Sequence, residues 1–141
     1  MLVSPEIDFR IRKSFALQTF MTTINAEIAV IEDGRVVIEA PTGQGFLQQN
    51  GFAHGGLIFT LGDTAAGYAA LTKLPLDVEV MTVEMKINLL SPGSGKLRAE
   101  GRILKAGRRI TVVAADVWAE DSAERRKQVA ALQGTMIPVE R

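Results

Sequence analysis

One uninterrupted apolar segment constrains the fold of this chain more than any other feature. Residues 56–72 contain no proline, show no strand-like alternation and carry a single charge, Asp63. A segment of this length that is apolar on all sides is typical of a buried helix. An ionised acid inside such a helix is costly unless it is paired or used, and burial raises its pKa. The sequence therefore predicts a central helix over residues 56–72, with Asp63 as the first candidate for catalysis.

The entrance to this helix is a glycine-bounded turn that holds the only histidine, His54, followed by Gly55 and Gly56. Backbone N–H groups at a helix start are unpaired, and glycines let the backbone approach a ligand closely. Such donors stabilise an oxyanion. Asp63 lies about 10 Å further along the helix axis. The N–H groups at the helix start and the Asp63 carboxylate of one protomer are therefore too far apart to contact the same substrate atom. This distance favours a site shared with a two-fold partner.

The rest of the chain predicts one further helix and six strands in an α+β domain covering residues 1–141. Ser4 and Pro5 are typical of a helix start, and this N-terminal helix is expected over residues 1–22. A turn at Asp33-Gly34 predicts a hairpin, and four alternating strands after residue 77 predict a meander. Met81 and Met85 are assigned to the core. Such a sheet must curl round the central helix, and its open edges predict a partner subunit.

Composition excludes several classes of function. The chain carries 16 basic and 16 acidic side chains, so it has no net field for nucleic acid or an anionic membrane. With no cysteine and one histidine, a zinc site and disulfides are not expected. No apolar run predicts a signal peptide or a transmembrane span, so we expect a cytoplasmic protein.

Several motifs together resemble a known family. The run Gly51-Phe-Ala-His-Gly-Gly56, the nine-residue spacing from His54 to Asp63 and the following Thr-Ala-Ala-Gly resemble the hotdog-fold acyl-CoA thioesterases. The likeness is greatest to the phenylacetic-acid-degradation (PaaI-type) branch. It continues in three blocks at residues 82–92, 101–109 and 130–136. The resemblance implies a hotdog fold, in which an antiparallel sheet of about six strands wraps round the central helix.

The resemblance also implies roles for individual residues. Asp63 corresponds to the family's catalytic carboxylate, a general base or a nucleophile, and the Gly55 N–H would polarise the thioester carbonyl. His54 would position the substrate or the departing thiolate, and Thr82 would orient the attacking water. The family commonly has Asn six residues before the histidine, where this chain has Gln48.

The expected substrate-binding residues have ordinary structural explanations as well. Gly56 and Thr64 adjoin the catalytic positions, while Asn50 is a polar loop residue. Arg108 and Arg109 lie at a predicted hairpin tip, where they could hold the phosphates of coenzyme A or simply aid solubility. Thr82 fits a strand regardless of function.

The function expected from these residues is hydrolysis of small, medium-chain or aryl acyl-CoA thioesters, without a cofactor or metal. The resemblance implies a homodimer, with dimers pairing into tetramers. Two alternatives stay open at this point: a hotdog hydratase or dehydratase, and a non-catalytic acyl-CoA-binding module. The sequence does not fix the acyl group, or the choice between general-base and covalent catalysis.

Overall fold

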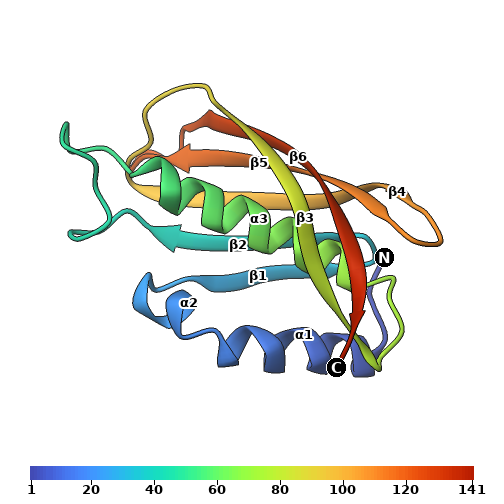
Figure 1. Ribbon diagram of the computed structural model, residues 1–141. Coiled ribbons are helices and arrows are strands. Elements are labelled where there is room, and N and C mark those ends of the chain that lie inside the picture. The colour runs from blue at the N-terminus through green and yellow to red at the C-terminus, as the bar shows by residue number, and fades with distance from the viewer.

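A single curved sheet wraps round one long helix in the structure, a computed structural model that describes all 141 residues (Figure 1). The sheet has six antiparallel strands in the order β1-β2-β4-β5-β6-β3. The elements are α1 Pro5–Leu17, α2 Thr19–Thr23, β1 Glu27–Glu32, β2 Arg35–Pro41, α3 Gly55–Leu71, β3 Val78–Leu89, β4 Lys96–Ala106, β5 Thr111–Glu120 and β6 Arg126–Glu140. This architecture confirms the predicted hotdog arrangement.

The central helix α3 begins and ends within one residue of the prediction, and it is buried against the concave side of the sheet. The closest approach is at Gly101 of β4. A Cβ atom there would lie 2.2 Å from the carbonyl carbon of Ala65. The helix backbone therefore rests directly on the strand, and only glycine leaves the room for this contact.

The N-terminal helix is shorter than predicted. The Ser4 side chain accepts a hydrogen bond from the Ile7 N–H and Pro5 is the first helical residue, as the sequence indicated. Gln18 then adopts an extended conformation (φ −80°, ψ 98°), so α1 ends at Leu17 and a separate short helix follows. The expectation of one helix over residues 1–22 is therefore wrong.

The order of the last four strands also differs from the prediction. The strands β4, β5 and β6 form a meander, but β3 pairs with β6 and lies at the edge of the sheet. No β3–β4 hairpin forms because the connecting loop is held elsewhere. The Leu90 N–H donates to the Val129 carbonyl (2.8 Å), and the Gly93 carbonyl accepts from the Ala53 N–H (2.8 Å).

A β-bulge between Thr82 and Glu84 changes which side chains of β3 face the helix. Before the bulge Thr82 is half-buried, whereas Met81 and Val83 are 50% and 56% exposed. The prediction that Met81 belongs to the core is therefore wrong, although Met85 packs against the core. A bulge adds one residue to the strand and shifts the alternation, which a strict two-residue period cannot anticipate.

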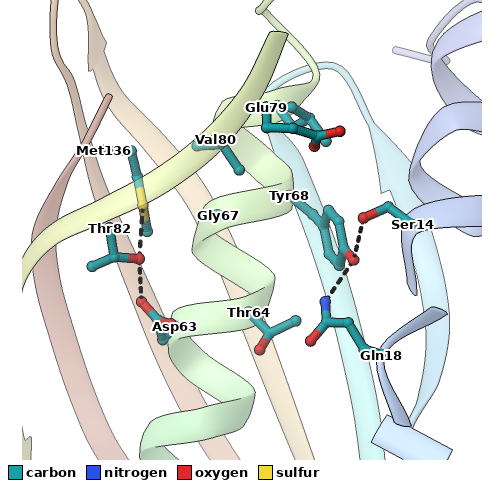
Figure 2. A pocket seen from close by; sticks show the side chains of 11 residues that line it. Ser14, Gln18, Asp63, Thr64, Gly67, Tyr68, Glu79, Val80, Thr82 and Met136 are labelled. Carbon is teal, nitrogen blue, oxygen red and sulfur yellow. Dashed lines mark hydrogen bonds between the residues drawn. The ribbon is translucent and has the colours of Figure 1, made fainter. Parts of the chain in front are cut away.

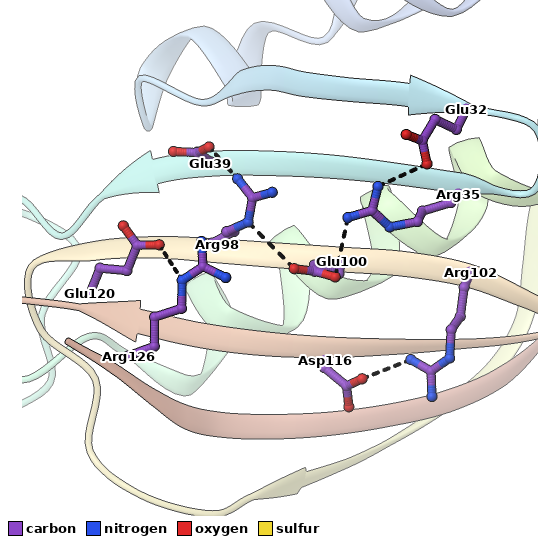
Figure 3. A network of polar contacts seen from close by, with 9 residues as sticks. All are labelled: Glu32, Arg35, Glu39, Arg98, Glu100, Arg102, Asp116, Glu120 and Arg126. Atoms are coloured by element: carbon purple, nitrogen blue, oxygen red, sulfur yellow. Dashed lines mark hydrogen bonds and ion pairs between the residues drawn. The ribbon is translucent and has the colours of Figure 1, made fainter. Parts of the chain in front are cut away.

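The convex face of the sheet carries a network of paired charges (Figure 3). Arg98 contacts Glu39 at 2.6 Å and Glu100 at 3.4 Å, and Arg102 contacts Asp116 at 2.7 Å. Further pairs join Glu32 to Arg35, Arg35 to Glu100 and Arg126 to Glu120. These contacts tie neighbouring strands together on the side of the sheet away from α3.

Candidate active site

Asp63 is half-buried on α3 and faces strand β3. The Thr82 hydroxyl donates a hydrogen bond to Asp63 Oδ1 at 2.8 Å, and the same hydroxyl oxygen lies 3.2 Å from Met136 Sδ (Figure 2). The ion pairs of the structure all involve other acids. The ordinary explanation of a helix acid neutralised by a basic neighbour therefore does not apply to Asp63.

The surroundings of Asp63 alter its acidity in two opposing ways. Burial raises the pKa of the Asp63 carboxyl, and the hydrogen bond from Thr82 lowers it by less, so the pKa lies above its ordinary value. Burial disfavours the charged form, while a donor to the carboxylate favours it. A carboxylate whose pKa is raised toward neutrality is a stronger base, as proton abstraction requires.

The start of α3 uses most of its free N–H groups within the chain. His54 is the N-cap: its Nδ1 accepts from the Gly56 N–H at 2.8 Å, and its carbonyl accepts from the Leu57 and Ile58 N–H groups. The Gly56 N–H is therefore already used within the chain, and a substrate-binding role for Gly56 stays a prediction. The Gly55 N–H has no partner.

His54 therefore has a structural task that the sequence did not indicate. Because Nδ1 accepts a hydrogen bond, the proton of the neutral imidazole lies on Nε2. The ring is exposed, so this Nε2–H group is accessible to a ligand. The N-cap also fixes the direction in which the Gly55 N–H leaves the helix.

Gln48 holds the loop before α3. Its side-chain oxygen accepts hydrogen bonds from the backbone N–H groups of Asn50 (2.5 Å) and Phe52 (3.3 Å). The Asn50 side chain is exposed. Gln48 and Gly55 both line a hollow of about 380 Å³, together with Leu89 and the loop after β3.

The candidate residues thus fall into two separate places on one chain. Asp63, Thr64 and Thr82 line a cavity of about 190 Å³ between α3, β3 and α1. The hollow with Gly55 and Gln48 lies at the start of α3. No residue lines both the hollow and the cavity beside Asp63. The carboxylate and the free N–H group therefore form two half-sites.

Arg108 and Arg109 contribute to neither half-site. They are exposed in the turn between β4 and β5, at the end of the molecule opposite the start of α3 (Figure 1). A role in holding coenzyme A stays a prediction for both residues.

The cavity beside Asp63 also contains residues that sequence reasoning missed. The Tyr68 hydroxyl accepts a hydrogen bond from Gln18 Nε2 (2.6 Å) and lies 3.0 Å from Ser14 Oγ. Burial raises the pKa of Tyr68 and outweighs these hydrogen bonds, which lower it, so the phenol stays protonated. One signal was available, since Tyr68 is the only tyrosine of the chain and interrupts an apolar helix.

Comparison with known proteins places this chain in a family. Residues 50–125, which include Gly55, Asp63 and Thr82, match the family model of the thioesterase superfamily. The chain belongs to the thioesterase superfamily. Among solved thioesterases, a thioesterase family protein from Silicibacter pomeroyi superposes with a TM-score of 0.91 at 32% identity, covering 96% of this chain and 99% of that one.

Two further comparisons give one likeness of fold and one of sequence. The PaaI protein from the phenylacetic acid degradation operon of E. coli superposes with a TM-score of 0.84 at 19% identity, covering 97% of this chain and 96% of that one. An esterase candidate from Saccharolobus solfataricus is 35% identical over 91 residues, which are 64% of this chain. The match spans 64% of the length of that relative. No helix of this chain is long and apolar enough to cross a membrane.

Proposed function

We propose that this protein hydrolyses acyl-CoA thioesters to the free acid and coenzyme A. The observation that carries the proposal is Asp63, a half-buried carboxylate without an ion-pair partner that lines a cavity and has a raised pKa. Buried acids of this kind, with a shifted pKa and a cleft in front of them, are candidates for general-base catalysis.

In the proposed reaction, the Asp63 carboxylate takes a proton from a water molecule as the water oxygen attacks the thioester carbonyl. The new C–O bond forms, the C–S bond breaks, and the proton passes from Asp63 to the departing thiolate. Thr82 donates its only hydroxyl proton to Asp63, so it orients the carboxylate and can accept from the water, but cannot donate to it.

The oxyanion of this reaction needs a hydrogen-bond donor, and the chain that supplies Asp63 places no free backbone N–H of its α3 start beside that carboxylate. The Gly55 N–H is the free donor at the start of α3, and it lines the other half-site. We therefore infer that each complete site combines Asp63 of one subunit with Gly55 of the partner subunit. One such donor is worth about 3 kcal/mol in the transition state.

The edge strand β3 is the surface on which we expect the two subunits to meet. It has 12 residues and pairs only with β6, so its outer row of N–H and C=O groups is unpaired. Met81, Val83 and Leu89 on this strand are 50–58% exposed. A long open edge of this kind is a template for pairing with a strand of another chain. Pairing of such dimers into tetramers is the further expectation from the family resemblance.

The activity is tested by measuring free thiol released from a panel of acyl-CoA esters that includes hexanoyl-CoA and phenylacetyl-CoA. Wild-type protein should release thiol, and Asp63→Ala should abolish the release. Hydration of crotonyl-CoA without thiol release, or tight binding of the esters without turnover, would contradict hydrolysis.

Gly55 offers a direct test of the oxyanion donor. Gly55→Pro removes the N–H at the first helical position, where proline is tolerated, and His54 before it is already extended (φ −61°, ψ 138°). Gly55→Ala is the matched control, because it keeps the N–H and adds a Cβ that would meet the flexible Leu89 side chain at 3.0 Å. We expect a loss of about 10²- to 10³-fold in kcat for proline relative to alanine.

The shared site is tested by mixing two inactive variants. A dimer of one Asp63→Asn chain and one Gly55→Pro chain has one site with both groups intact, whereas each homodimer has none. Random reassociation should therefore restore about a quarter of the wild-type activity, since half the dimers are mixed and one of their two sites is complete. Sites contained within single chains would give no recovery.

A further inference from the structure

The cavity next to Asp63 continues along α3 to a polar end at the C-terminal part of helix α1 and the residue after it, Gln18. Asp63 and Thr82 lie at one end of the cavity, and Ser14, Gln18 and Tyr68 lie at the other (Figure 2). Its volume is about 190 Å³. An apolar protein cavity of about 150 Å³ holds a benzene molecule, so this space suits a short acyl group.

The polar end has hydrogen-bonding capacity to spare. Gln18 uses one N–H on the Tyr68 hydroxyl, and the Tyr68 hydroxyl lies within hydrogen-bonding distance of Ser14. The second side-chain N–H of Gln18 and its side-chain amide oxygen have no partner in the chain. A neutral amide and hydroxyl can each donate and accept, so this cluster can complete its bonds with a hydroxyl group.

The charges around the cavity are of one sign. Its lining contains two carboxyl groups, Asp63 and Glu79, and no lysine or arginine. Glu79 is paired with Arg141 at 2.7 Å, and Arg141 does not line the cavity. A substrate carboxylate would therefore meet like charge without a basic partner.

Helix α1, which contains Ser14 and is followed directly by Gln18, is fixed to the body of the protein. Arg10 of α1 is buried and donates to the carbonyl oxygens of Leu74 (3.0 Å), in the connection between α3 and β3, and of Val78, the first residue of β3. Phe15 packs on the Tyr68 ring with the ring centroids 6.3 Å apart. The polar end is thus a fixed wall, as discrimination between substrates requires.

We propose that this cavity receives the acyl group and that its α1 end selects short acyl groups that end in a neutral hydrogen-bonding group, such as a hydroxyl. The selectivity rests on the hydrolase function proposed above. A terminal methyl would face the cluster without completing its hydrogen bonds, and a site that hydrogen-bonds a substrate hydroxyl rejects the analogue that lacks it. Tyr68 and Gln18 are the specificity-determining residues.

The test compares three esters with acyl chains of six carbons: hexanoyl-CoA, 6-hydroxyhexanoyl-CoA and the monothioester of hexanedioic acid with CoA. For the wild-type protein we expect kcat/KM to be about tenfold higher for the hydroxyl than for the methyl terminus, as one hydrogen bond contributes. The carboxylate terminus should be the poorest substrate. Tyr68→Phe and Gln18→Leu should bring the hydroxyl-to-methyl ratio close to one.

A control variant separates selectivity from the anchoring of α1. Phe15→Leu weakens the contact between α1 and Tyr68 but leaves the polar cluster intact, so it should lower both rates together and keep their ratio. If Tyr68 and Gln18 only anchor α1, their variants should likewise keep the wild-type ratio.

The outcomes distinguish the selectivity from the underlying activity. Thiol release at equal rates from the hydroxyl and methyl esters would overturn the selectivity and leave the hydrolase function standing. A hydroxyl preference that persists in both Tyr68→Phe and Gln18→Leu would overturn it as well. Absence of thiol release from every ester would remove both proposals.

Discussion

Acidic side chains on the two sides of the sheet differ in whether they form ion pairs. On the convex face Glu39, Glu100 and Asp116 each contact an arginine on the same or a neighbouring strand (Figure 3). On the concave face Asp63 has only a neutral hydroxyl as partner, and burial raises its pKa. Paired surface acids stabilise the fold slightly, whereas an unpaired buried acid costs stability and remains reactive. The comparison therefore separates paired acids of structural value from a half-buried acid without an ion pair, which is available for chemistry.

The largest difference should appear when the two kinds of acid are neutralised. Asp63→Asn keeps the size of the side chain and its acceptor for Thr82, but removes the base. We expect kcat/KM for thiol release to fall about 10³-fold, within the range for general-base catalysis. Asp116→Asn, which loses the contact with Arg102, should stay within about twofold of wild type. Retention of a tenth of the activity by Asp63→Asn would refute the assigned base.

The second difference concerns neighbouring residues of β4 that face opposite sides. Gly101 lies against the backbone of Ala65, and Arg102 pairs with Asp116 in solvent. Gly101→Ala must displace α3 and should lower the free energy of unfolding by about 3 kcal/mol. Arg102→Ala should lower it by less than about 1 kcal/mol. Urea denaturation measures both values, and similar losses would contradict the packing described here.

The predictability of the fold follows from how local each signal is. The buried helix and the Asp33-Gly34 hairpin were predictable because apolar patterning and turn chemistry act within a few residues. The edge position of β3 was not, because it depends on hydrogen bonds between its loop and distant residues such as Val129. The bulge after Thr82 and the break at Gln18 likewise have no residue that marks them.

The residues of the candidate site likewise differ in how far the sequence could predict them. Asp63 and Gly55 were identified from one short motif, in which charge and glycine are conspicuous in an apolar stretch. The family resemblance implied that Thr82 orients the attacking water, and the structure shows its hydroxyl hydrogen-bonded to Asp63. Ser14 and Gln18 could not be found, because 50 or more residues separate them from Tyr68 and only the packing of α1 brings them together.

A smaller effect is expected from the partner of the catalytic acid. The Thr82 hydrogen bond favours the ionised form of Asp63, so Thr82→Val should raise the pKa of Asp63 further. The value of kcat/KM should rise with pH through this pKa, because only the ionised carboxylate acts as a base. The kcat/KM profile of Thr82→Val should therefore move to higher pH. Below the inflection kcat/KM should fall about tenfold, as for a lost charged hydrogen bond. Thr82→Ser is the control and should keep the wild-type profile. An unchanged profile in the valine variant would exclude this coupling.

The smallest effect is on stability, and its sign should differ between the two faces. The pKa of Asp63 is raised in the folded protein. Its contribution to folding stability is therefore most favourable in acid and is lost as pH rises through that pKa. Asp63→Asn should accordingly be more stable than wild type at pH 8. For Glu120, partial burial raises the pKa, but contacts with Lys96 and Arg126 outweigh it and lower the pKa. Its contribution is present at neutral pH and is lost as pH falls, so Glu120→Gln should be slightly less stable than wild type only at neutral pH.

Thermal unfolding at pH 4 and pH 8 measures both contributions. In acid, each variant should approach the wild-type melting temperature. Shifts of the same sign at pH 8 would contradict the contrast between the two faces.

The unpaired side of β3 has a consequence for how the protein responds to dilution. A lone chain presents 12 residues of strand with one row of backbone groups open to any other strand. If a second copy normally occupies that row, association and folding are thermodynamically linked, and the melting temperature rises with protein concentration. Conditions that keep chains apart would then leave a species prone to add foreign strands, so loss of quaternary structure and onset of aggregation should coincide.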